Sequence, residues 1–103
     1  MKTLESALPA TRPDRPATQL LHDEENARVV SFHLLPDQRV APHRSESTVL
    51  VQVVAGEGLF QGEGDEVHLL AGETAVFAPG EMHSMRPVGG ALRFLAIITP
   101  RPR

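Results

Sequence analysis

Apolar residues along this chain come in short runs that glycine and proline interrupt, and no stretch of ten or more keeps a helical period. The strongest run covers residues 48–55, where Thr48 and four valines are β-branched, as strands favour. Further strands are predicted over residues 28–35, 59–61, 67–70, 74–78 and 91–99. Short strands at fairly even intervals are typical of a sandwich or barrel, so we predict an all-β fold.

Composition limits the size of the fold and its chemistry. The chain has 103 residues, of which 41% are hydrophobic, which suits one domain with one core. Phenylalanine is the only aromatic type, so the core must be mostly aliphatic. The absence of cysteine excludes disulfides, thiolate zinc sites and thiol nucleophiles. Any catalysis would therefore depend on histidine, carboxylates, hydroxyls, or a metal held by nitrogen and oxygen.

The domain boundaries are predicted from the distribution of proline. Pro9, Pro13 and Pro16 make residues 1–18 a flexible arm, followed by a barrel domain over 19–100 and a tail over 101–103. No signal-peptide run or membrane-spanning segment is present, so we expect a cytoplasmic protein without a membrane partner. The net charge of −3 and the short basic tip, Arg101 and Arg103, favour no nucleic-acid partner.

Two segments resemble the two motifs of the cupin superfamily. The first family motif is glycine, five residues, His-x-His, three or four residues, Glu, six residues, glycine. Here Asp37 stands at the first glycine, His43 at the first histidine, Ser45 at the second, Val49 at the glutamate and Gly56 at the last glycine. Aspartate tolerates a left-handed turn better than most residues, so the first turn can survive.

The second family motif is glycine, five residues, Pro-x-Gly, two residues, His, three residues, Asn. Gly72, Gly80 and His83 match it in register, whereas Ala78 replaces its proline and Pro87 its asparagine. The resemblance spans roughly residues 29–98. It implies a small single-domain cupin, a jelly-roll barrel or double-stranded β-helix, with one small ligand inside and a homodimeric state.

The resemblance also implies a metal site, since the family commonly holds a divalent ion with three histidines and a glutamate. This sequence keeps two of those positions, His43 and His83. Iron, manganese, nickel or zinc would need a further ligand. Glu46, one residue past Ser45, is the tentative third ligand, and His33 on the preceding strand is another candidate. His22 and His68 are expected on strands or the surface.

The strand over 48–55 predicts the wall of the site. If Val49 faces the interior, as the family glutamate does, then so does Val51, while Leu50 and Val54 face outward. An apolar wall with a few polar groups is typical of a small-molecule site, and the outward apolar face favours a homodimer. The predicted pocket residues are Ser45, Val49, Val51, Phe77, Met85 and Arg86.

Three functions stay open at this point. The first is a small-molecule-binding barrel with an incomplete or atypical metal site on His43 and His83. The second is a metal-dependent enzyme, of oxygenase, isomerase or decarboxylase type, with a substitute third ligand. The third is a structural or partner-binding barrel whose former site is filled by side chains such as Val49, Val51 and Phe77. Whether the chain is an enzyme is left undecided.

Overall fold

The computed structural model describes residues 1–4 and 10–102, and these form nine strands and no helix. The strands are β1 (Ala17–Asp23), β2 (Arg28–Leu34), β3 (Val40–His43), β4 (Thr48–Ala55), β5 (Glu57–Gln61), β6 (Glu66–Leu70), β7 (Thr74–Phe77), β8 (His83–Pro87) and β9 (Leu92–Thr99). Within this part of the chain, no helix is long and apolar enough to cross a membrane.

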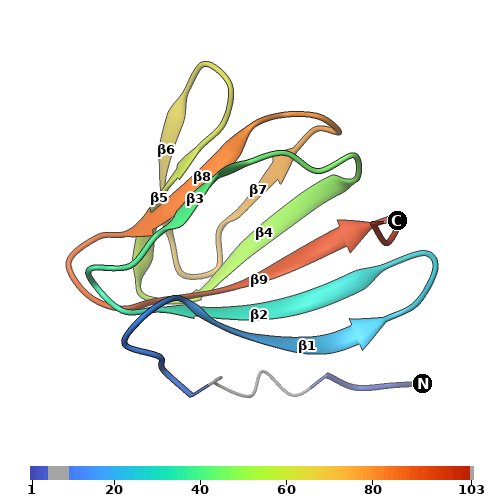
Figure 1. The fold of residues 1–103 in the computed structure, drawn as a ribbon, viewed down its shortest axis with the longest axis horizontal. Coiled ribbons are helices and arrows are strands. Elements are labelled where there is room, and N and C mark those ends of the chain that lie inside the picture. Colours follow the sequence, from blue (N-terminus) through green and yellow to red (C-terminus); the bar gives the residue numbers. More distant parts are fainter. Residues whose placement is uncertain (5–9, 103) are drawn as a thin grey trace.

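The strands build two antiparallel sheets that face each other (Figure 1). One sheet has the order β1-β2-β9-β4-β7 and the other has the order β3-β8-β5-β6. The chain crosses repeatedly between the sheets, as a jelly roll requires. The structure therefore confirms the predicted all-β fold of the double-stranded β-helix type.

The six predicted strands are all present, with ends within two residues of the predictions. Strands β1, β3 and β8 were not predicted from the sequence. Their segments carry few β-branched residues, and Pro42 and Pro87 lie within β3 and β8, where proline removes a donor from the strand ladder. Tertiary pairing with β2 and with each other holds these segments extended.

Strand β1 begins two residues before the predicted domain start, and its first residue, Ala17, is buried. The preceding segment is tied to the barrel by the buried Gln38, whose side-chain amide donates hydrogen bonds to the carbonyls of Arg12 and Arg15. The predicted flexibility of residues 1–18 stays a prediction. Residues 5–9 of that arm, and residue 103 of the predicted tail, lie outside the described residues.

The core lies between the sheets, and its alternation follows the predicted period of two. Val49, Val51 and Val53 are buried, whereas Gln52 and Val54 are exposed on the outer face of β4. Phe94 of β9 is 1% exposed at the centre of this core. Its ring stacks on Phe32, with ring centroids 4.7 Å apart, and meets Phe60 edge-on at 5.6 Å.

Gly56, the glycine that ends the first motif, is required by the turn between β4 and β5. Its φ is +77°, a conformation that L side chains rarely adopt. A Cβ at this position would lie 2.2 Å from the carbonyl oxygen of Ala91. The two backbone segments therefore approach too closely for a side chain at this position.

Candidate functional site

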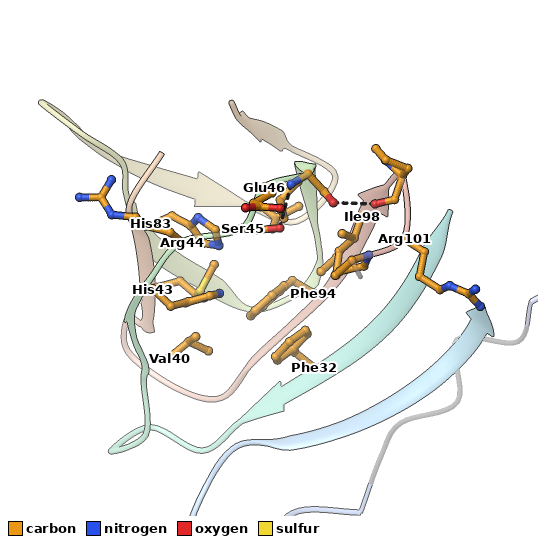
Figure 2. A pocket seen from close by; sticks show the side chains of 17 residues that line it. Phe32, Val40, His43, Arg44, Ser45, Glu46, His83, Phe94, Ile98 and Arg101 are labelled. Carbon is orange, nitrogen blue, oxygen red and sulfur yellow. Dashed lines mark hydrogen bonds between the residues drawn. The ribbon is translucent and has the colours of Figure 1, made fainter. Parts of the chain in front are cut away.

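A cavity of about 820 Å³ opens between the two sheets (Figure 2). Its inner wall is apolar and comes mainly from β2, β4 and β9. The residues of this wall are Phe32, Val49, Val51, Phe94, Ala96 and Ile98. Polar side chains gather on the segment after β3 and on β8, and the short segment 100–102 after β9 completes the rim. The polar lining residues are His43, Arg44, Ser45, Glu46, Ser47, His83 and Arg101.

His43 and His83 form a pair across two neighbouring strands. They are register partners in the β3–β8 ladder, and their ring centroids lie 4.2 Å apart with the ring planes at 65°. His43 is exposed at the mouth, whereas His83 is 3% exposed. Figure 2 shows both imidazoles on the same side of the cavity, facing the apolar floor formed by Phe32 and Phe94. The structure thus brings the two histidines of separate motifs together.

The hydrogen bonds of the two rings fix their tautomers. Nδ1 of His43 donates to the carbonyl of Ala41, and Nδ1 of His83 donates to the carbonyl of Glu81, each at 3.0 Å. A carbonyl oxygen only accepts, so each neutral ring carries its proton on Nδ1. Nε2 of both rings is consequently left as an acceptor. The polar end of the cavity therefore offers two hydrogen-bond acceptors.

The surroundings of His83 keep this ring neutral. Burial lowers the pKa of His83 below its ordinary value, and the neighbouring His43 acts in the same direction, against an opposing contribution from the hydrogen bond to Glu81. Phe77 stacks on the ring with centroids 4.6 Å apart and planes at 16°. Contacts with Phe77 and His43 therefore orient the ring, and its burial favours the neutral form.

The remaining predicted site residues fall into two groups. Ser45, Glu46, Val49, Val51 and Met85 line the cavity with the histidines.

Phe77 and Arg86 are not among the residues that line the cavity. Phe77 supports His83 from the core, and Arg86 is exposed beside a smaller depression of about 210 Å³ on the outer side of β8. His33 is buried on β2 without lining the cavity. His22 and His68 lie on β1 and β6, away from it.

The donor set does not fit a resident divalent metal. Protein sites for zinc or iron supply three or four ligands, and the family positions give only His43 and His83 here. Glu46 lines the cavity and is exposed. Nevertheless, the described part of the chain contains no group of three or more histidine, aspartate or glutamate side chains arranged to hold a metal ion.

Several lining residues were missed from the sequence. Phe94, Ala96 and Ile98 alternate along β9, so the same period of two that identified Val49 and Val51 could have found them. The lining residues Ser47, Pro100 and Arg101 follow no such alternation in the sequence.

The hydroxyl of the buried Ser47 donates to the carbonyl of Pro100 at 2.6 Å, which holds the segment after β9 against the rim. Arg101 continues that segment and forms an ion pair with Asp23 at 3.6 Å. Figure 2 shows its side chain pointing away from the histidines.

The sequence and fold of this chain match a protein family and several solved structures. The family model described as an AraC-like ligand-binding domain matches residues 29–103. An RmlC-like cupin from Desulfovibrio desulfuricans is 30% identical, with a TM-score of 0.82 and 97% of each chain covered. No protein with a curated description matches the sequence.

Two further solved structures are similar. A conserved Klebsiella pneumoniae protein with a double-stranded β-helix domain is 26% identical, with a TM-score of 0.82, covering 89% of this chain and 83% of its own. A Thermus thermophilus protein is 25% identical, with a TM-score of 0.84, covering 88% of this chain and 89% of its own.

Proposed function

Because the chain belongs to the family of AraC-like ligand-binding domains and has the cupin fold, we propose that it binds a small, largely apolar molecule inside the barrel. The single observation that carries this proposal is the cavity of about 820 Å³, which lies within the range of ligand sites in proteins. The third function considered from the sequence was a barrel filled by its own side chains. Such a barrel would leave no space of this size. Val49 and Val51 line the cavity instead of closing it.

The chemistry of the lining supports a particular class of ligand. The floor is made of the stacked Phe32 and Phe94 with aliphatic neighbours, which favours a flat apolar body. The two Nε2 acceptors of His43 and His83 favour a hydroxyl or another donor on that body. A molecule with an apolar ring and one hydroxyl group would match both ends of the cavity.

Binding of this kind needs no resident metal, and we propose that the two-histidine site works as a hydrogen-bond acceptor pair. The atypical metal site and the metal-dependent enzyme inferred from the family motif both require a third ligand. Elemental analysis of untagged protein tests both of them against a metal-free binding domain. About one equivalent of transition metal, lost in His43→Ala, would mean a metal site on the histidine pair and would contradict the metal-free proposal.

The proposal is tested with two probes that share one body and differ in a single donor. 2-Naphthol carries a hydroxyl, whereas 2-methoxynaphthalene has the same rings without a donor. Their fluorescence can be followed without protein background, because the chain contains neither tryptophan nor tyrosine. We expect 2-naphthol to bind about 5- to 10-fold more tightly, the equivalent of one net hydrogen bond.

Matched variants assign this difference to the cavity. His43→Ala should reduce the preference for 2-naphthol, because it removes one of the two acceptors. His68→Ala, which changes an exposed histidine on β6 away from the cavity, should leave the preference intact. Equal affinities in the wild-type protein would exclude the acceptor role, and no binding of either probe would count against the ligand-binding function.

The expected homodimer and cytoplasmic location stay predictions. Support for a dimer comes from the outer face of the five-stranded sheet, where Leu50 has Ile97 and Val76 as its register partners. Val76 is 60% exposed, and Val54 lies on the same face of β4. Sedimentation at several protein concentrations measures the state directly.

A further inference from the structure

Glu63 lies on the hairpin between β5 and β6, outside the lining of the cavity, yet it contacts both segments that carry the histidine pair. One carboxylate oxygen, Oε1, accepts a hydrogen bond from Nη1 of Arg44 at 2.8 Å. The same oxygen accepts the backbone N–H of Met82 at 3.0 Å. Arg44 directly follows His43, and Met82 directly precedes His83.

The strand ladder alone does not hold these two segments in continuous register. In the β3–β8 pair, Val40 faces Met85 and His43 faces His83, with an irregularity between the two pairs. Pro42 falls within this interval and has no N–H to donate. The end of the ladder at which the imidazoles lie therefore needs support from outside the two strands.

We propose that Glu63 is a positioning residue, which sets the separation of the His43 and His83 rings by holding Arg44 and Met82 on one oxygen. Its consequence for ligand affinity rests on the proposed binding function, whereas its effect on the ring geometry does not. No sequence motif indicates this role, because Glu63 is 19 residues from each of its partners.

Further contacts extend the same support. Nη1 of Arg44 also donates to the carbonyl of Gly80 at 2.8 Å, and the N–H of Gly80 donates to the carbonyl of Ser45 at 2.7 Å. These two bonds join the segment after β3 to the turn before β8.

A second carboxylate, that of Glu81, anchors the hairpin from the other side. It accepts the N–H of Glu63 at 3.1 Å and the N–H of Ala78 at 2.9 Å. The backbone carbonyl of Glu81 accepts a hydrogen bond from Nδ1 of His83. Glu63 is therefore linked to the residue that follows His43 and, through Glu81 and Met82, to the residues that precede His83.

The ion pair by itself would be a weak device. The side chains of Arg44 and Glu63 are 56% and 54% exposed, and exposed pairs contribute little in water. The backbone hydrogen bond from Met82 is therefore the stronger of the two restraints. This bond is the largest cause of the lowered pKa of Glu63, and the hydrogen bond from Arg44 is the second. The lowered pKa keeps the carboxylate ionised, so that it can accept both bonds.

Two substitutions separate the hydrogen bond from the charge. Glu63→Ala removes both, whereas Glu63→Gln loses the charge but keeps an oxygen that can accept the N–H of Met82. Glu66→Ala on the same hairpin is the matched control, because its side chain is exposed and outside the contacts described above. Folding of each variant is checked by far-ultraviolet circular dichroism.

The readout is the NMR titration of the two imidazoles without any ligand, together with the NOE between the two rings. In Glu63→Ala we expect loss of this NOE and an upward shift of the His83 pKa, because water gains access to the ring. Glu63→Gln and Glu66→Ala should keep the NOE and show no upward shift of the His83 pKa. Removing a negative charge alone would lower a histidine pKa, so the sign of the shift separates the two causes.

An unchanged NOE and an unchanged His83 titration in folded Glu63→Ala would overturn the positioning role. Equal effects of Glu63→Gln and Glu63→Ala would overturn the part assigned to the Met82 bond. Should Glu63→Ala fail to fold, Arg44→Ala removes the other contact and must weaken the same NOE. Loss of the NOE with normal 2-naphthol binding would retain the positioning role and contradict only its importance for the proposed function.

Discussion

Replacing Phe94 with leucine tests whether the aromatic floor of the cavity stabilises the fold. Phe94 is 1% exposed and contacts two other rings, stacking on Phe32 at 4.7 Å and meeting Phe60 edge-on at 5.6 Å. Leucine keeps an apolar side chain at this position and loses both ring contacts. The loss of stability in this variant therefore measures the aromatic contacts more than the burial of apolar area.

The expected loss follows from those two contacts. Each aromatic pair contributes about 0.5–1.5 kcal/mol beyond its buried area, so Phe94→Leu should cost about 1–3 kcal/mol. Phe94→Ala, which also opens a void, should cost about 3–5 kcal/mol. Because domains of this size have total stabilities of about 5–15 kcal/mol, the leucine variant should fold while the alanine variant approaches the limit.

Urea unfolding followed by far-ultraviolet circular dichroism measures the effect, since the chain has no tryptophan or tyrosine to report it by fluorescence. A cycle with Phe32→Leu isolates the stacked pair and should give a coupling energy of about 0.5–1.5 kcal/mol. Val67→Ala, at a 43% exposed position on β6 in the other sheet, should change stability by less than about 0.5 kcal/mol. A coupling energy of zero, within about 0.3 kcal/mol, would refute the reasoning.

Three further predictions concern backbone, pH and metal. Gly56→Ala should destabilise the protein more than Gly64→Ala in urea unfolding, because both have positive φ but only Gly56 would place a Cβ against Ala91, at 2.2 Å; equal losses would contradict the close approach. The unfolding free energy should fall as the pH drops from the ordinary histidine value of 6.5 through the lower folded pKa of His83, because the unfolded chain binds the proton more readily; a slope that persists unchanged in His83→Gln would assign it elsewhere. Dialysis against EDTA should leave the affinity for 2-naphthol unchanged, and an affinity loss that added zinc or iron reverses would require a metal in the site.

Much of the fold could be predicted because strand period and turn residues are local signals. The valines of β4 predicted a strand, the family position of Val49 predicted its inward face, and Gly56 and Gly72 marked turns in the two motifs. Strands β3 and β8 could not be found in this way. Strand β3 is held extended by pairing with β8, and β8 by pairing with both β3 and β5, whereas Pro42 and Pro87 argue locally against a strand.

The site residues likewise include some that local sequence motifs identify and some that depend on tertiary contacts. His43 and His83 were identified by their places in two motifs, and the structure brings them to a ring separation of 4.2 Å. The part of the rim after β9 could not be predicted, because the bond from Ser47 to Pro100 joins residues 53 apart. Glu46 was predicted as a third metal ligand from its place next to Ser45; it lines the cavity, and its role as a ligand stays a prediction.

The most direct test of the central claim is the place where a ligand binds. Intermolecular NOEs between 2-naphthol and the assigned methyl groups of the metal-free protein locate it. Binding inside the barrel predicts NOEs to Val49, Val51 and Ala96, which line the cavity. NOEs only to Val54 and Val76, on the outer face of the five-stranded sheet, would contradict a ligand site within the barrel.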